Sequence, residues 1–260
     1  MLPAYLLPLL LGGFGLIIGS FLNVVAYRVP RGESIVAPRS RCPACSATIL
    51  PRDNVPLLSW LVLRGHCRSC GVRIPARYVA VEGITGAVFA ALAARFGLTA
   101  DLAVSLALAA SLVVAPTIAL AALRVPRSVA AVPLLLAGAI AVAFAVAGEW
   151  QRPAAAVLGA AVAWSLAAAG RVQAGEREMF LVAGFLLGWS GLETEVVGAG
   201  FVMLGLLAGA LLRRGSNGKA GMPALDRSRV TMIALSCGAV MAVLLAGTLI
   251  PIWGWSRHFS

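Results

Sequence analysis

Cys42-Pro43-Ala44-Cys45 and Cys67-Arg68-Ser69-Cys70 are two Cys-x-x-Cys motifs, separated by 21 residues, in the hydrophilic segment 27–78. No other hydrophilic segment of the sequence is long enough to fold by itself. Two such turns can surround one ion with four thiolates in a tetrahedron, and the spacing is close to that of zinc ribbons. Pro43 and Gly71 favour tight turns at the two motifs. The pattern predicts a structural zinc site formed by Cys42, Cys45, Cys67 and Cys70, because four cysteine ligands leave no open position for catalysis.

The rest of the chain is apolar. Of its 260 residues, 60% are hydrophobic and 12% charged, and the mean hydropathy is +0.93, whereas soluble domains carry about 45–50% apolar and about 25% charged residues. This composition excludes a soluble globular enzyme, a disordered chain and a disulfide-rich secreted module. Apolar runs of about 17–25 residues can cross a bilayer. About eight spans are predicted, near 4–26, 79–95, 102–122, 129–148, 153–169, 179–192, 196–212 and 230–250.

The predicted fold is therefore an all-α polytopic membrane protein with a small zinc-binding insertion after its first helix. Its parts are the first transmembrane helix (1–26), the zinc-binding domain (27–78) and a transmembrane bundle (79–260). The first span is expected to be retained, because it lacks the basic start and the small-residue cleavage site of a signal peptide.

Arginine and lysine set the expected orientation, because they collect on cytoplasmic loops. With segment 27–78 inside, eighteen of the 21 basic residues lie inside; the three outside are Arg95, Arg152 and Arg257. This predicts a cytoplasmic zinc domain and both termini outside. The net charge of +11 then follows from topology, and no nucleic-acid partner is expected.

Two disulfides or four free thiols are the alternatives to zinc, and a reducing cytoplasm disfavours the disulfides. His66 adjoins Cys67 and could replace a ligand, although a solvated histidine is the simpler interpretation. Cys237 falls in the last predicted span, where a small core residue is expected.

Ordered polar motifs surround the cysteines from residue 12 to residue 95. They are Gly19-Ser20-Phe21-Leu22-Asn23-Val24-Val25-Ala26-Tyr27-Arg28-Val29-Pro30, Arg41-Cys42-Pro43-Ala44-Cys45, Asp53-Asn54-Val55-Pro56-Leu57-Leu58-Ser59-Trp60-Leu61, Arg64-Gly65-His66-Cys67-Arg68-Ser69-Cys70-Gly71, Arg77-Tyr78 and Glu82-Gly83-Ile84-Thr85-Gly86. In content and order they resemble the amino-terminal region of the type IV prepilin peptidases, aspartic membrane proteases that also N-methylate their product.

The resemblance implies an enzyme of the bacterial inner membrane that serves type IV pili or type II secretion. Its substrates would be pilin-like precursors, cleaved at the cytoplasmic face and then methylated from S-adenosylmethionine. The cysteine-bearing domain is associated with methylation and with holding the substrate. Five residues fall in that substrate and methylation region: Asn23, Arg28, Asp53, Asn54 and Glu82. For Glu82, a structural pairing with Arg73 or Arg77 is an equal alternative, and a turn role is an alternative for Asp53 and Asn54.

The expected pair of catalytic aspartates is not intact. Aspartic proteolysis needs two carboxylates that share a water molecule. The family places one aspartate at the end of the third span, where Ala119 stands here, and the other in a Gly-Asp-x-Lys motif, where Glu176 replaces the aspartate and Glu178 the lysine. For both glutamates a solvated helix start is the alternative role.

The resemblance and the altered aspartate positions are compatible with three functions. The first is a prepilin peptidase and N-methyltransferase with a divergent dyad, in which Glu176 is catalytic. The second is a peptidase-dead relative that keeps methylation, and the third is a scaffold that only binds precursors. The absence of paired intramembrane charges argues against a transporter or channel.

Removing one thiolate tests the zinc assignment. In Cys42→Ser or Cys67→Ser, bound zinc is expected to be lost, because the remaining three sulfurs no longer complete the tetrahedron. The metal content of the purified protein, measured by mass spectrometry, checks this. Cys237→Ser is the control and should retain the metal, and a wild-type protein without zinc would contradict the assignment.

Overall fold

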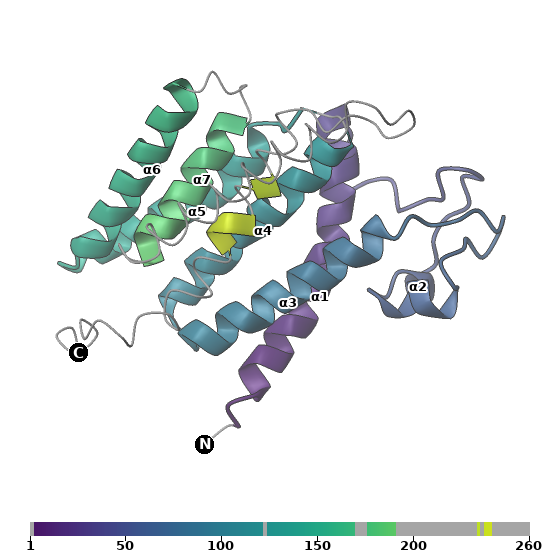
Figure 1. Ribbon diagram of the computed structural model, residues 1–260. Helices are drawn as coiled ribbons and strands as arrows, with labels where there is room; N and C mark the ends of the chain where they lie inside the picture. The colour runs from purple at the N-terminus through teal and green to yellow at the C-terminus, as the bar shows by residue number, and fades with distance from the viewer. Residues whose placement is uncertain (1–2, 122–123, 170–175, 191–232, 235–236, 241–260) are drawn as a thin grey trace, which may run out of the picture. The chain divides into compact units, whose positions relative to one another are not determined.

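The computed structural model describes residues 3–121, 124–169, 176–190, 233–234 and 237–240. They form helices joined by turns and isolated bridges, with no strand among these residues. The chain divides into two compact units, residues 1–98 and residues 99–260 (Figure 1). The second long helix therefore groups with the first helix and the cysteine-bearing segment, whereas the predicted division assigned it to the transmembrane bundle.

The first unit is a pair of long helices with a small lobe inserted between them. Helices α1 (Leu6–Arg28) and α3 (Arg77–Phe96) are apolar and have 23 and 20 residues. At about 1.5 Å per residue, both can cross a hydrocarbon layer of about 30 Å. Residues 29–76, here called the four-cysteine lobe, contain the 3₁₀ turns η1 (Val29–Arg31) and η2 (Pro51–Asp53) and the short helix α2 (Leu58–Val62).

Glycines let α1 and α3 pack with their backbones in near contact. A Cβ at Gly15 would lie 2.8 Å from the Thr85 carbonyl oxygen, and a Cβ at Gly19 would lie 2.7 Å from the Glu82 Cα atom. Gly12 faces Ala90, so contacts fall along α3 as they rise along α1, and the two helices are antiparallel. Small residues are the usual means of close helix packing in membranes.

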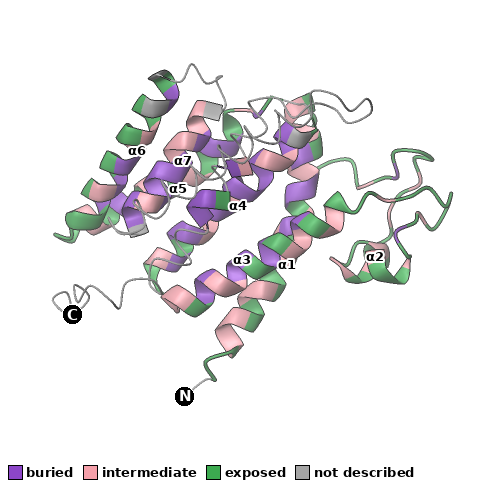
Figure 2. Ribbon diagram, viewed as in Figure 1, coloured by how far each residue is buried: buried purple, intermediate pink, exposed green. Residues whose placement is uncertain are grey.

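The second unit contains α4 (Ala100–Leu120), α5 (Ser128–Val146), α6 (Gln151–Ala169) and α7 (Glu176–Ser190). Helices α6 and α7 also meet at glycines: a Cβ at Gly184 would lie 2.3 Å from the Gly159 carbonyl oxygen. Helix α4 is the most buried of the candidate spans, and its buried residues include Val104, Leu108 and Ile118 (Figure 2).

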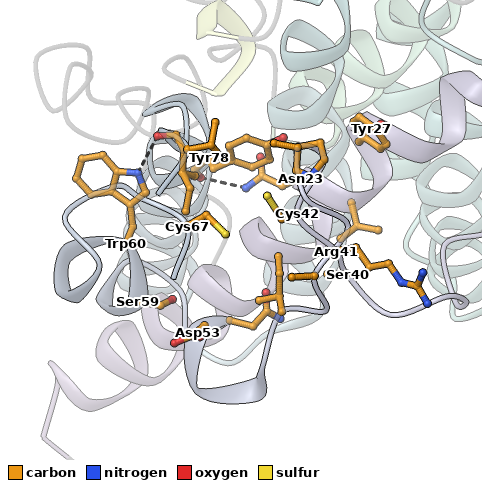
Figure 3. Close-up of a pocket in the computed structure, with 18 of the residues that line it drawn as sticks. Asn23, Tyr27, Ser40, Arg41, Cys42, Asp53, Ser59, Trp60, Cys67 and Tyr78 are labelled. Atoms are coloured by element: carbon orange, nitrogen blue, oxygen red, sulfur yellow. Dashed lines mark hydrogen bonds between the residues drawn. The ribbon is translucent and has the colours of Figure 1, made fainter. Parts of the chain in front are cut away.

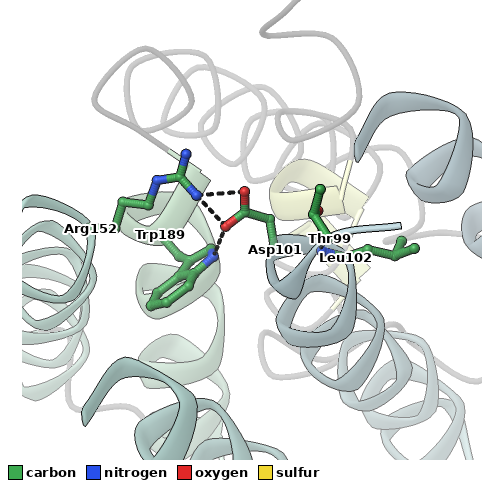
Figure 4. Close-up of polar contacts among 5 residues, drawn as sticks. All are labelled: Thr99, Asp101, Leu102, Arg152 and Trp189. Atoms are coloured by element: carbon green, nitrogen blue, oxygen red, sulfur yellow. Dashed lines mark hydrogen bonds and ion pairs between the residues drawn. The ribbon is translucent and has the colours of Figure 1, made fainter. Parts of the chain in front are cut away.

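A polar cluster connects three helices at one end of the second unit. Asp101, in the first turn of α4, accepts hydrogen bonds from Arg152 at 2.5 and 2.6 Å and from the Trp189 indole at 3.0 Å (Figure 4). The starts of α4 and α6 and the end of α7 therefore meet there. Ala119 lies 18 residues further along α4, about 27 Å away.

Six of the predicted spans coincide with long helices within a few residues. Helices α1, α3, α4 and α5 are long and apolar enough to cross a membrane by length and composition, whereas α7 has 15 residues and spans only about 22 Å. The predicted span 196–212 lies outside the described residues, as does most of 230–250, so eight spans remain a prediction. Cys237, predicted to be a small core residue, is exposed within the described part of the chain.

Replacing an interfacial glycine tests the α1–α3 contact. Gly19→Val should lower the melting temperature in detergent, because the new side chain would clash with the backbone of α3. Overpacking of this kind lowers the free energy of unfolding by about 1–3 kcal/mol. Gly13→Val is the matched control, since no atom lies within 4 Å of a Cβ built at Gly13. Equal melting temperatures for the two variants would contradict the packing.

Candidate functional site

The two cysteine motifs form equivalent turns. In each, the amide after the second cysteine donates to the carbonyl of the first cysteine at 2.9 Å, and the first cysteine's amide donates to the carbonyl two residues beyond the second, also at 2.9 Å. The residues after the second cysteines, Ser46 and Gly71, have φ values of 58° and 69°. Glycine adopts this left-handed conformation at little cost, whereas Ser46 is held in it by the turn.

The four cysteines converge on one point. Their Sγ atoms all lie within 4.8 Å of one another, and those of Cys42 and Cys70 are 3.9 Å apart. Tetrahedral zinc with bonds of about 2.3 Å separates its sulfurs by about 3.8 Å, so the cluster fits the ion. Backbone amides of Cys45 and Ala44 lower the pKa of the Cys42 thiol to about 7. At Cys70 the Val72 amide is outweighed by hydrogen bonds with the neighbouring thiols, which raise the pKa of Cys70 to about 12. The cysteines are free rather than disulfide-bonded.

His66 does not belong to this cluster. Its Nδ1 lies 2.7 Å from the Arg64 carbonyl oxygen, and its side chain is exposed. The solvated interpretation of His66 is therefore the one that the structure favours.

Two side-chain contacts hold the lobe together around the cysteines. Arg68, inside the second motif, donates to both carboxylate oxygens of Asp53, at 2.6 and 2.8 Å. This hydrogen bonding holds the pKa of Asp53 below its usual range. The Trp60 indole of α2 donates to the Ile74 carbonyl oxygen at 3.2 Å. Asp53 thus lies in a turn, η2, as one interpretation predicted, and also pairs with the metal-binding segment.

The lobe is attached to the helix pair by two further hydrogen bonds. The Leu57 amide donates to Glu82 Oε2 at 2.8 Å, and Asn23 Nδ2 donates to the Tyr78 carbonyl oxygen at 3.0 Å. Asn23 is buried, with 8% of its surface exposed. Glu82 accepts this hydrogen bond from the start of α2, and no ion pair joins it to Arg73 or Arg77 among the described residues.

A cavity of about 700 Å³ lies between the lobe and the ends of α1 and α3 (Figure 3). All five residues predicted for the substrate and methylation region line it: Asn23, Arg28, Asp53, Asn54 and Glu82. Cys42 and Cys67 line it as well, so the expected metal site forms part of its wall. Six arginines and three acids border the cavity, and its surroundings are therefore positively charged.

Sequence reasoning missed several contributors to this site. Arg68 stands in the sequence only as the middle of a cysteine motif, whereas in the structure its bidentate pair with Asp53 fixes the segment between the motifs. Leu57 and Tyr78 contribute backbone atoms, and the identity of a side chain does not predict such a contact. The φ of +58° at Leu57, unusual for a leucine, directs its amide toward Glu82 and is likewise invisible in the sequence.

The expected aspartate positions lie in the second unit. Ala119 is in the last turn of α4 and is 4% exposed, whereas Glu176 begins α7 and its side chain lies outside the described residues. Glu178 pairs with Arg127 at 2.9 Å, consistent with a structural role at this helix start. Asp101 cannot replace the missing aspartate, because it lies at the opposite end of α4 and is held by Arg152.

Comparison with known proteins identifies the first unit. Residues 14–96 match the bacterial peptidase A24 N-terminal domain family, a range that includes most of α1, the whole lobe and α3. No solved structure matches the chain.

Several curated relatives are similar over longer stretches. A prepilin leader peptidase/N-methyltransferase of Myxococcus xanthus is 43% identical over 214 residues, which are 81% of this chain and 58% of that protein. Its Bacillus subtilis counterpart is 34% identical over 208 residues, 76% of this chain and 79% of that protein. In Escherichia coli O78:H11, a type 4 prepilin-like proteins leader peptide-processing enzyme is 46% identical over 101 residues, 32% of this chain and 38% of that protein. The chain thus spans less than two thirds of the Myxococcus relative and about four fifths of the Bacillus one, and it belongs to the prepilin leader peptidase/N-methyltransferase family.

Proposed function

We propose that this chain N-methylates the new amino terminus of pilin-like proteins whose leader has already been removed, at the inner membrane, and does not itself cleave the leader by a carboxylate pair. The observation that carries the proposal is the contrast between its two units. The first unit has a formed cavity with every residue predicted for substrate binding and methylation on its wall. In the second unit, the position of one catalytic aspartate is a buried alanine.

The cavity has the size and polarity of a small-ligand site, which usually measures about 300–1,000 Å³ and holds a few convergent polar groups. S-adenosylmethionine supplies an electrophilic methyl group when bound. The residues of this chain would hold the incoming amino terminus and accept its proton. The Glu82 carboxylate, half-buried at the cavity wall, is the proposed partner of that amine, and Asn23 shapes the floor beside it.

The charge of the cavity supports a ligand that carries a carboxylate. The guanidinium groups of three of its arginines, Arg39, Arg41 and Arg73, form no hydrogen bond or ion pair with the described residues. The amino-acid portion of S-adenosylmethionine presents such a carboxylate, and arginine binds carboxylates with two parallel hydrogen bonds. Zinc at the four cysteines would be structural and would keep the cavity wall in place.

Cleavage fails in this proposal for lack of a second carboxylate. The mechanism needs one charged and one protonated carboxyl group on the same water. Ala119 supplies no oxygen, and Glu178 pairs with Arg127 at the same helix start as Glu176. One carboxylate alone does not reproduce the geometry in which two carboxyl groups hold the same water molecule.

Leader cleavage with a divergent dyad is the second candidate. Glu176 keeps a carboxylate at the start of α7, and the curated relatives carry the name prepilin leader peptidase. An acid supplied from residues outside the described ranges would complete such a dyad.

Restoring the aspartates tests the absence of cleavage. Purified protein in detergent, mixed with a pilin precursor, is expected to leave the leader intact, as read by mass spectrometry of the precursor's amino terminus. Ala119→Asp combined with Glu176→Asp should introduce cleavage, because both carboxylates then stand at the family's positions. Ala115→Asp with Glu176→Asp is the matched control, since Ala115 is also buried and one helical turn away. Leader removal by the wild-type protein, abolished by Glu176→Ala, would establish the second candidate instead.

Methylation is tested separately on a pilin whose leader has already been removed. In the presence of S-adenosylmethionine, the wild-type protein is expected to add one methyl group to the new amino terminus. A known active family member, run on the same pilin, shows that the substrate is competent. If that enzyme methylates the pilin and this chain does not, the scaffold function is the correct one.

A further inference from the structure

The short helix α2 presents an apolar face that nothing in the first unit covers. Leu58, Leu61 and Val62 are 58%, 62% and 67% exposed (Figure 2). The opposite side of α2 is used inside the lobe, where Trp60 bonds to the Ile74 carbonyl oxygen. The outward residues therefore contribute little to the folding of the lobe, and three adjacent large apolar side chains on one helix mark a contact surface.

The start of α2 is fixed at a depth close to the membrane boundary. The Leu57 amide bonds to Glu82, five residues after the start of α3, which is about 7 Å along that helix. The Leu57 side chain lies over Gly83, with its Cδ2 3.9 Å from the position of a Cβ there. Next along α3, Ile84 is 54% exposed on a helix long enough to cross the bilayer. Leu57, the residue before α2, therefore lies beside the part of α3 where apolar surface is offered to lipid.

Positively charged residues flank α2 in the sequence. Arg52 precedes α2 and Arg64 follows it, and both are exposed. Segment 27–78 carries nine arginines against two acids, Glu33 and Asp53. Anionic lipid headgroups attract such basic segments beside a transmembrane helix, and a helix with apolar residues on one side and cations around it is typical of those that lie in the interface.

We propose that α2 is an interfacial helix that lies in the anionic surface of the same bilayer that α1 and α3 cross. Leu58, Leu61 and Val62 enter the boundary between headgroups and acyl chains, while Arg52 and Arg64 contact the headgroups. The four-cysteine lobe is thereby held against the membrane at two places, through Glu82 and through lipid. This interaction goes beyond the proposed methylation and does not depend on it.

Fluorescence quenching in nanodiscs tests this contact. The full-length protein is placed in discs of phosphatidylethanolamine and phosphatidylglycerol, with an environment-sensitive fluorescent amino acid incorporated at position 61 or, in a second variant, at position 58. The control carries it at position 69, because Ser69 is exposed and belongs to the second cysteine turn rather than to α2. Zinc content, compared with wild type, shows that the lobe of each variant is folded.

Reporters at positions 58 and 61 are expected to be quenched by lipids brominated on the acyl chain and protected several-fold from aqueous iodide, relative to position 69. Replacing phosphatidylglycerol with phosphatidylcholine should reduce that protection. Equal iodide quenching at positions 61 and 69 would overturn the proposal. Protection that arises only after addition of a pilin precursor would also overturn it, since the face would then bind the precursor rather than the lipid.

Discussion

The close contact between α1 and α3 is the constraint on which the first unit depends. Because Gly15 and Gly19 bring the helix backbones together, Asn23 and Glu82 stand at the same level where the two helices meet the lobe. The lobe starts and ends on this pair, so the two helices hold both of its ends. The cysteine cluster orders the 48 residues between the two helices. The hydrogen bonds of Leu57 and Tyr78 set the orientation of the lobe relative to α1 and α3.

The two units differ in the polar groups that they bring together. In the first, the metal cluster, the Asp53–Arg68 pair and the Glu82 contact all border one cavity, and a change in any of them would alter its shape. In the second, the helix packing around Gly184 and Gly188 is tight, but Ala119 offers no reactive group at the end of α4. The packing of these helices depends on small and apolar residues rather than on acids.

The sequence was sufficient to predict some of these features and not others. Cysteine spacing predicted the cluster, because four thiols with two-residue gaps have few other ways to converge. Long apolar runs predicted α1, α3, α4 and α5 within a few residues, since the bilayer sets their length. The partner of Glu82 was not predictable, because it is a backbone amide aimed by an unusual leucine conformation. The grouping of α3 with α1 depends on glycine contacts between residues about 70 positions apart in the sequence. The length and hydropathy of an apolar run do not indicate which other helix it packs against.

The central claim is that the cavity beside Glu82 is where the amino terminus is methylated. Its most direct test is the rate of methyl transfer from isotopically labelled S-adenosylmethionine to a pilin amino-terminal peptide, compared among wild type, Glu82→Ala and Glu82→Gln with equal zinc content. The account predicts transfer by wild type, its loss in Glu82→Ala, and partial retention in Glu82→Gln, whose amide oxygen can still accept the Leu57 hydrogen bond. Transfer at the wild-type rate in Glu82→Ala would contradict it.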